Sequence, residues 1–221
     1  MHRILPTRDA YDQWAAGYPP QPHNPLMRAE QKAMLEHWPA VAGRRALDLA
    51  CGTGRYARLL AQSGASEVCA VDFSAAMLWQ ASVGDRVRAN MMQLPFIDDA
   101  FEIVISGLAL GHASEIRGWM GETARVLKGG GVLLYSDFHP EAARAGLTRS
   151  FKDALNRSFT LPHCCYGLSD QREAVAAANL TLEVMHEVRV GVDLQEAFPG
   201  SDAFYREWRG LPLVLIVRAR K

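Results

Sequence analysis

Apolar positions along the chain follow two different periods, and each change of period marks an expected element. Short apolar runs of strand length alternate with segments whose apolar residues recur every three to four positions, which is typical of amphipathic helices. This alternation predicts an α/β fold, a mostly parallel sheet with helices on both faces. We expect strands over residues 44–50, 67–73, 86–90, 101–108, 129–138, 181–190 and 211–220, and helices over 25–38, 55–62, 74–82, 116–127 and 169–180.

The last two strands differ from the others because no clear helix connects them. Residues 181–190 alternate apolar and polar side chains, whereas the closing run "LPLVLIVRAR" is continuously apolar, as expected of a strand buried on both faces. Strands joined without a crossover helix form an antiparallel pair. The complete expectation is therefore a Rossmann-like seven-stranded sheet, mostly parallel, with a final antiparallel strand.

The length of 221 residues suits a single domain. Within it we expect an N-terminal lid and helix (residues 1–40), a core for a bound cofactor (44–137), an irregular insertion followed by a helix, strand and loop (138–210), and the final strand (211–221). The segment before residue 25 is aromatic and proline-rich, and its pattern indicates no strand.

The charge and the cysteine content restrict the classes of partner and the cellular location that the sequence predicts. The chain has 24 basic and 24 acidic residues, so its net charge is zero, and a nucleic-acid partner is not expected. No apolar run reaches signal-peptide or membrane-spanning length, which predicts a cytoplasmic protein with reduced cysteines and no membrane contact. The cysteines (Cys51, Cys69, Cys164 and Cys165) show no C-x-x-C spacing, and no metal is expected.

The stretch "ALDLACGTGRYARLL" (residues 46–60) carries the first chemical signal. Gly52, Gly54 and Ala57 fit the G-x-G-x-x-G/A pattern of dinucleotide-binding turns, and Asp72 supplies the acid expected about 20 residues later. Asp48, however, precedes the glycines and would repel a pyrophosphate. The same carboxylate would attract a ligand that presents an ammonium and a sulfonium.

Four motifs extend this signal. "ALDLACGTG", "VDFSAAML", "LPFIDDAFEIVISGLALGH" and "ARVLKGGGVLLYSDF" occur in the order and spacing of the class I S-adenosylmethionine-dependent methyltransferases. The chain most resembles the branch that includes the ubiquinone/menaquinone- and biotin-pathway enzymes. The resemblance implies that S-adenosyl-L-methionine is the methyl donor and S-adenosyl-L-homocysteine the product.

The resemblance also assigns donor contacts. Asp72 would accept both ribose hydroxyls, Phe73 would lie against the adenine, Asn90 would meet the adenine amino group, and Met91 would offer its backbone N–H. Gly107 would meet the methionine portion. Ala50 and Gly129 replace a glycine and a proline common in the family, which we expect binding to tolerate. The expected donor-binding residues are Tyr11, Asp48, Ala50, Gly52, Gly54, Asp72, Phe73, Met77, Asn90, Met91 and Gly107.

The acceptor half is less defined by the sequence. A sulfonium is an activated donor, so in-line alignment of an O, N or C acceptor is the main requirement, and a base helps only where a proton must leave. His112, His139, Asp137 and Tyr18 are the candidate catalytic residues, while His186, on an apolar face, is expected to be structural. Tyr11, Trp14 and Tyr18 are expected to form a lid. A late aromatic loop indicates a closed pocket for a small or carrier-tethered organic molecule; its aromatic residues are Phe198, Phe204, Tyr205 and Trp208.

Two other functions fit the same sequence. One is an RNA-modifying methyltransferase, and the other is a non-catalytic protein that binds adenosylmethionine on the same fold, because a fold does not fix a function. Methyl transfer to any acceptor separates an enzyme from a scaffold. Both a monomer and a homodimer agree with the sequence.

Overall fold

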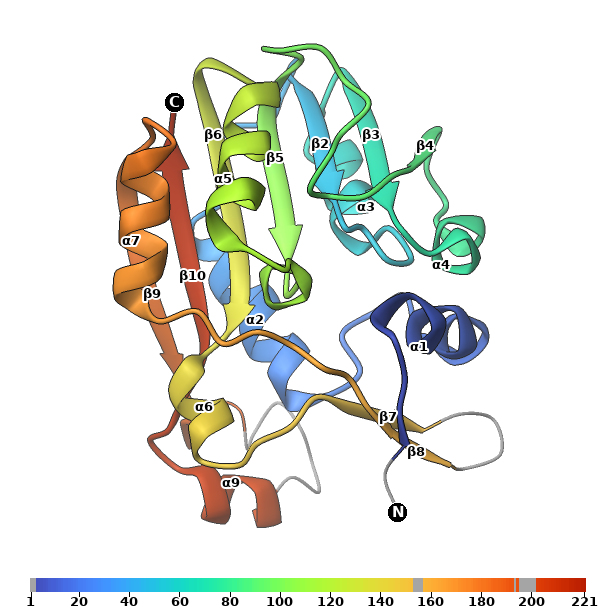
Figure 1. The fold of residues 1–221 in the computed structure, drawn as a ribbon, viewed down its shortest axis with the longest axis vertical. Coiled ribbons are helices and arrows are strands. Elements are labelled where there is room, and N and C mark those ends of the chain that lie inside the picture. Colours follow the sequence, from blue (N-terminus) through green and yellow to red (C-terminus); the bar gives the residue numbers. More distant parts are fainter. Residues whose placement is uncertain (1–2, 153–156, 193, 195–201) are drawn as a thin grey trace.

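The computed structural model describes residues 3–152, 157–192, 194 and 202–221, and it confirms the expected Rossmann-like fold. The seven strands of the main sheet lie in the order β4-β3-β2-β5-β6-β10-β9 (Figure 1). They are β2 (Arg45–Leu49), β3 (Glu67–Asp72), β4 (Asp85–Arg88), β5 (Phe101–Gly107), β6 (Leu127–Phe138), β9 (Thr181–Arg189) and β10 (Pro212–Arg220). The pairs from β4 to β6 are parallel, whereas β10 is antiparallel to both β6 and β9, as expected for the final strand.

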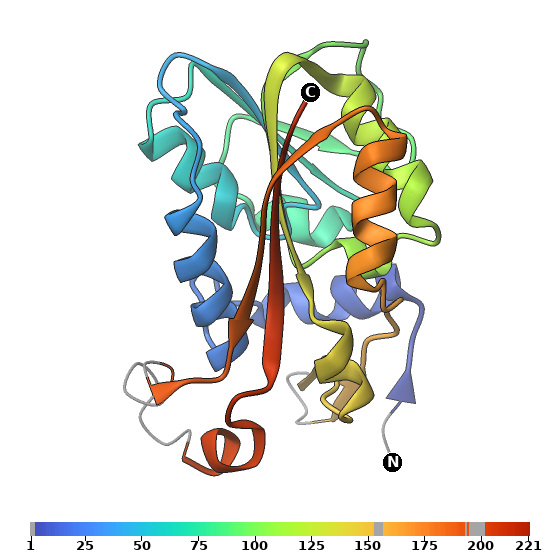
Figure 2. The same ribbon diagram turned by 90° about the vertical axis from the view of Figure 1, so that its left-hand side faces the viewer.

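Helices cover both faces of this sheet. In the view of Figure 2, α2 and α3 lie on one side of the sheet and α5 and α7 on the other. The bounds are α2 (Pro25–Glu36), α3 (Arg55–Gln62), α4 (Ala75–Gln80), α5 (Ile116–Val126) and α7 (Leu168–Ala177). Two buried clusters, one on each face, form the core, and the interior of β10 is buried on both faces.

Local sequence signals fix where these helices begin. The Asn24 side chain accepts a hydrogen bond from the Met27 N–H at 2.9 Å, and Pro25 occupies the first helical position of α2. Ser74 caps α4 in the same way, accepting from the Met77 N–H at 3.1 Å. Because α4 starts directly after β3, this cap sets the direction of the chain just beyond the carboxyl end of that strand.

The N-terminal segment and the insertion depart from the expectation. Residues before position 25 contain a strand, β1 (Arg3–Ile4), which pairs in parallel with β8 (Ser158–Thr160), and β8 pairs antiparallel with β7 (Ser150–Lys152). The expectation of no strand before residue 25 was therefore wrong, as was the irregular character of residues 138–168. Strands of two or three residues are too short to show a period in the sequence.

Further short helices accompany this small sheet. They are α1 (Thr7–Trp14), a 3₁₀ turn at Ala15–Gly17, a second 3₁₀ turn at Leu110–His112, α6 (Pro140–Arg144) and α9 (Asp202–Trp208). Ala10 of α1 packs with Phe151, Phe159 and Leu161 in a buried cluster of its own. This cluster joins the N-terminal segment to the insertion. Separately, α9 occupies part of the region that we expected to be a late aromatic loop.

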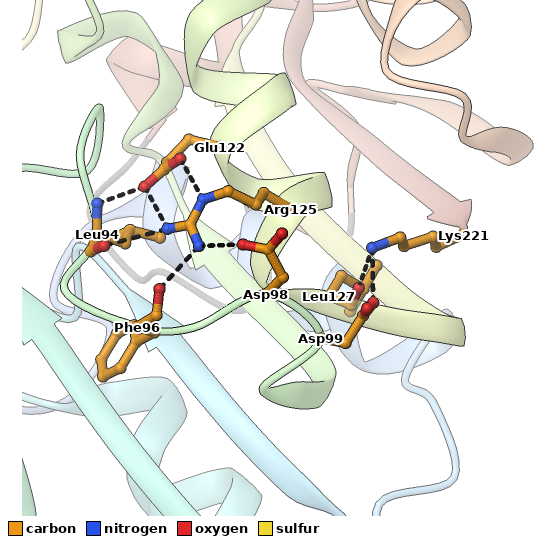
Figure 3. Close-up of polar contacts among 8 residues, drawn as sticks. All are labelled: Leu94, Phe96, Asp98, Asp99, Glu122, Arg125, Leu127 and Lys221. Atoms are coloured by element: carbon orange, nitrogen blue, oxygen red, sulfur yellow. Dashed lines mark hydrogen bonds and ion pairs between the residues drawn. The ribbon is translucent and has the colours of Figure 1, made fainter.

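Arg125 on α5 fixes the loop that follows β4 (Figure 3). Its guanidinium donates to both carboxylate oxygens of Glu122 and to Asp98, each at 2.8 Å, and to the carbonyls of Phe96 and Leu94 at 2.8 and 3.1 Å. The Leu94 N–H in turn donates to Glu122. The loop is thus held to a helix at several points.

Replacing this arginine is expected to loosen the loop. Arg125→Ala leaves two backbone carbonyls and Glu122 without their donor. The free energy of unfolding should therefore fall by about 1.5–3 kcal/mol. Urea denaturation measures the change. Arg117→Ala on the same helix is the matched control, because the Arg117 side chain is exposed and pairs with an exposed partner, Glu173, at 3.7 Å. An equal decrease in the free energy of unfolding in both variants would contradict the role given to Arg125.

Candidate active site

A cavity of about 700 Å³ lies at the carboxyl ends of β2, β3 and β5. This edge of an open parallel sheet is where α/β proteins bind ligands. In Figure 1, α1 lies across from these strand ends. The lining includes most of the expected residues: Tyr11, Tyr18, Asp48, Ala50, Gly52, Asp72, Phe73, Asn90, Met91, Gly107 and His112.

Two expected donor residues do not line the cavity. Gly54 caps the start of α3 in a left-handed conformation, with φ 77°. Met77 is fully buried in α4. Ala50 lines the cavity with φ 58°, also in the left-handed region. An L-residue is strained there, which explains why glycine suits this position in the family.

Asp72 holds the glycine loop through its carboxylate. One oxygen accepts from the Gly52 N–H and the other from the Ser74 N–H, both at 2.8 Å. Burial raises the pKa of this carboxyl, and the backbone N–H donors oppose the rise. A carboxylate accepts about four hydrogen bonds, so acceptor capacity remains for a ligand.

Asp48 is the more deeply buried carboxyl, with only 1% of its surface exposed. Its Oδ2 accepts from the Ala57 N–H at 2.7 Å. Burial raises its pKa to about 7, while the Ala57 N–H and the charge of Arg55 lower it. A cation bound in the cavity would favour the charged form.

The loop fixed by Arg125 brings Asn90 and Met91 to the cavity wall. The Asn90 Oδ1 accepts from the Met92 N–H at 2.9 Å, which orients the amide. Phe73 is 48% exposed at the cavity, with the Arg8 guanidinium 5.7 Å from its ring centroid. Asn90 and Phe73 thus line the same cavity.

Gly107 admits no side chain. A Cβ built there would lie 2.3 Å from the ring of Tyr56, whose hydroxyl donates to Glu30 at 2.6 Å. Glu30 is fully buried and also accepts from Ser136 at 2.7 Å and pairs with Arg55 at 2.7 Å. Glu30 was not predicted from the sequence, although an acid on the apolar face of the helix over residues 25–38 is a signal that could have found it.

His112 lies in a polar cluster with Tyr11 and Arg149. The Tyr11 hydroxyl lies 3.0 Å from the His112 Nε2, and the Arg149 guanidinium lies 3.2 Å from the same nitrogen. Burial, with the charge of Arg149, lowers the pKa of His112 to about 3. Arg149 was not predicted from the sequence, because no motif marks it.

The other candidate bases are placed differently. His139 is buried, caps α6 by accepting from the Glu141 N–H at 3.2 Å, and lies 3.0 Å from Glu187 through its Nε2. Asp137 accepts from the Gly111 N–H at 3.2 Å, and burial raises its pKa to about 6. Neither residue lines the cavity, so the structure does not bring them to the expected acceptor site.

The expected lid lines the cavity through Tyr11, Trp14 and Tyr18, and burial raises the pKa of Tyr18 to about 12. From the late aromatic segment, Phe204 lines it, whereas Tyr205 and Trp208 do not. Phe198 lies outside the described residues. His163 does not line the cavity either.

Several features lie away from the cavity. The four cysteines are free, with Cys164 and Cys165 exposed. Within the part of the chain that the structure describes, no helix is long and apolar enough to cross a membrane. His186 lies 2.9 Å from His37, and with Glu36 they form a cluster of metal-ligand type; none of the three lines the cavity.

Comparison with known proteins places this fold and site in a family. Residues 47–135 match the model of a methyltransferase domain. The chain is 31% identical over 170 residues to a malonyl-[acyl-carrier protein] O-methyltransferase from Enterobacter lignolyticus, covering 73% of this chain and 67% of that protein. It is 43% identical over 108 residues to a demethylmenaquinone methyltransferase from Clavibacter sepedonicus, covering 44% of this chain and 42% of that protein.

A solved structure agrees with these relatives. An S-adenosylmethionine-dependent methyltransferase from Mesorhizobium loti superimposes with a TM-score of 0.71 at 25% identity, covering 87% of this chain and 98% of that one. The chain belongs to the class I S-adenosylmethionine-dependent methyltransferases, in the branch that contains the demethylmenaquinone enzymes. It spans less than half the length of the Clavibacter enzyme.

Proposed function

We propose that this protein transfers the methyl group of S-adenosyl-L-methionine to a small or carrier-tethered organic acceptor. The observation that carries the proposal is a single cavity whose lining has an acidic wall and a polar wall. Asp48 and Asp72 at the strand ends form an acidic wall suited to a cationic nucleoside. Tyr11, His112 and Arg149 form a polar wall of the same cavity, where an acceptor would lie.

Within this proposal the residues that line the cavity have the following roles toward the donor. Asp72 accepts the ribose hydroxyls while keeping its bonds to the glycine loop. Phe73, Asn90 and Met91 surround the adenine, and the backbone of Gly107 meets the methionine portion, while the ring of Tyr56 fills the space beside its Cα. Asp48, which is buried in the cavity wall, supplies a second negative charge for the cationic donor. Gly54 and Met77 support the loop and helix behind these groups.

The acceptor side combines the N-terminal segment with the insertion. Malonyl-carrier and demethylmenaquinone enzymes are among the relatives, and their names describe a carrier-bound malonyl group and a quinone as acceptors. We extend that acceptor class to this chain. A small molecule or carrier-bound acyl group would enter between α1 and the cavity-lining residues 147–150 of the insertion. A cytoplasmic location belongs to the same proposal, because the exposed Cys164 and Cys165 suit a reducing compartment.

Calorimetry of donor binding tests the proposal. The wild-type protein is expected to bind S-adenosylhomocysteine and not NAD, because Asp48 opposes a pyrophosphate. Asp72→Asn keeps an acceptor for one backbone N–H but loses charge and one acceptor oxygen, so affinity should fall roughly tenfold. Binding of NAD in place of S-adenosylhomocysteine would overturn the proposal, as would an Asp72→Asn affinity equal to the wild type.

A further inference from the structure

Three side chains of metal-ligand type converge where the end of α2 meets β9. The Nε2 of His37 lies 2.9 Å from the Nδ1 of His186, and with the Glu36 carboxylate all the ligand atoms lie within 4.8 Å of one another. The helix α2 packs on β10 and β9 on one face of the sheet (Figure 2). Since none of the three residues lines the cavity, methyl transfer does not explain why they converge.

The fold holds both histidines in place. His37 is the C-cap of α2, and its carbonyl accepts a hydrogen bond from the Arg218 guanidinium at 3.1 Å. His186 lies within β9, opposite Ile216 of the neighbouring strand. The two histidines are 149 positions apart, so no sequence pattern marks the cluster.

The two imidazoles meet nitrogen to nitrogen and are not stacked. Their ring planes are perpendicular, at 90°, with centroids 5.1 Å apart. His186 is half-buried two residues before Val188, whose side chain packs against the core on the face that α2 covers. A polar ring on an apolar face costs free energy unless its nitrogens find partners. The contact with His37 supplies one partner, and a metal ion would bind both nitrogens at once.

The charges around the cluster favour a cation. Burial lowers the pKa of His37, and so does the neighbouring His186, so the ring is neutral at pH 7, which is the form that binds metals. Glu36 contributes a negative charge, and the carbonyl end of α2 adds the negative end of the helix dipole. The nearby cation, Arg218, is neutralised by Glu183 at 2.7 Å.

The ligand types select the class of metal. Two imidazoles and one carboxylate suit Zn²⁺, whereas Mg²⁺ and Ca²⁺ prefer oxygen ligands alone. Zinc bonds of about 2.0–2.1 Å in a tetrahedral arrangement place ligand atoms about 3.3 Å apart. The two histidine nitrogens would therefore separate by a few tenths of an ångström. Glu36 is exposed at the last position of α2, so its side chain can turn toward the ion.

We propose that Glu36, His37 and His186 form a zinc-binding site, with water as the fourth ligand, that ties the end of α2 to β9. The ion takes the place of the direct contact between the two rings. The other end of α2 lines the cavity through Asn24–Met27. Zinc would thus stabilise, from outside the cavity, a helix that builds part of its wall.

Metal titration tests the site. The full-length protein, without a histidine tag, is stripped with a chelator, dialysed and titrated with ZnCl₂ in a calorimeter. We expect one high-affinity zinc ion per chain. Zinc at about 100 times its Kd should raise the Tm by roughly 5–10 °C, because a ligand that binds the folded state stabilises it. Mg²⁺ and Ca²⁺ at the same concentration should leave the Tm unchanged.

Variants connect the binding to these side chains. His37→Gln and His186→Gln should each lower zinc affinity by more than about 100-fold, and Glu36→Gln by about tenfold. The double variant Cys164→Ser/Cys165→Ser is the matched control, because it removes the exposed thiols, which are also zinc ligands. Its zinc affinity should equal that of the wild type. The zinc-dependent change in Tm is compared within each variant, so a variant that is less stable by itself does not imitate loss of the site.

Cobalt reports the ligand type directly. Co²⁺ bound at the site should show visible absorption without the near-ultraviolet band of a thiolate-to-metal charge transfer. Such a band, lost in the cysteine double variant, would overturn the proposal. It would also be overturned by a wild-type protein that binds no zinc, or by zinc affinity that is unchanged in both histidine variants. Donor binding enters none of these measurements, so the proposed function stands or falls separately.

Discussion

Deleting residues 1–22 is expected to lower methyl transfer by roughly 10²- to 10⁴-fold while the seven-stranded sheet remains folded. The deleted segment supplies Tyr11, Trp14 and Tyr18 to the cavity wall. Without them water reaches the sulfonium, and Arg149 loses one of its orienting partners. Among the described residues, no strand of the main sheet pairs with this segment. Turnover with labelled donor and circular dichroism of the truncated protein measure the two effects.

The truncation also removes β1 and Ala10, so the small sheet and its buried cluster should lose stability. Deleting residues 1–4 alone is the control, because it removes β1 but keeps α1 and the aromatic wall. Most of the turnover should survive in that variant. Full activity after deletion of residues 1–22 would show that the segment is not part of the acceptor site.

Asp48→Asn is expected to stabilise the ligand-free protein and to weaken donor binding. Asparagine keeps the oxygen that accepts from the Ala57 N–H but carries no buried charge. The free energy of unfolding at pH 8 should rise by on the order of a few kcal/mol, since a tenfold change in proton affinity between the folded and unfolded states corresponds to about 1.4 kcal/mol. Affinity for the cationic donor should fall roughly 10- to 100-fold, because the ligand's positive groups lose their carboxylate.

The pH dependence identifies the charge as the cause. The folded-state pKa of Asp48, about 7, lies above the value of an unfolded aspartate, so the folded state binds more protons between these two values. Wild-type stability therefore falls as the pH rises from about 4 to about 7. The Asp48→Asn variant lacks this pH-dependent loss of stability. Its free energy of unfolding should therefore exceed that of the wild type by a large amount at pH 8 and by a small amount near pH 4. Urea denaturation at several pH values measures it.

Asp85→Asn on the exposed surface of β4 is the control for this effect. It removes one carboxylate without removing a buried charge, and its stability should follow the wild type at every pH. A pH-independent gain in Asp48→Asn would trace the effect to packing and contradict the electrostatic explanation.

The main sheet could be predicted because each strand is an apolar run long enough to show its period. The capped starts of α2 and α4 were equally visible, as Asn24-Pro25 and as Ser74. His139-Pro140 carries the same pair of signals as Asn24-Pro25, and it too starts a helix. We expected His139 at the cavity because it follows a strand. The structure instead uses it as the cap of α6.

The acceptor side could not be predicted because it depends on contacts between distant segments. Arg149 meets Tyr11 across 138 positions of the chain, and Ser136 meets Glu30 across 106. A charged residue in a polar stretch gives no sign of which cavity it will face. The cavity-lining residues Asp48, Gly52, Asp72 and Gly107 could be predicted because they lie at the ends of strands or directly after them, where the fold itself fixes their place.

The small sheet formed by β1, β8 and β7 has a consequence for how such a protein diversifies. It links β1 and α1 to the insertion outside the main sheet, so both segments form one module. Under the proposed function, substitutions in this module can exchange one acceptor for another while Asp48, Asp72 and the glycine loop stay unchanged. New specificities can therefore evolve at the periphery without a period in which the protein cannot bind its cosubstrate.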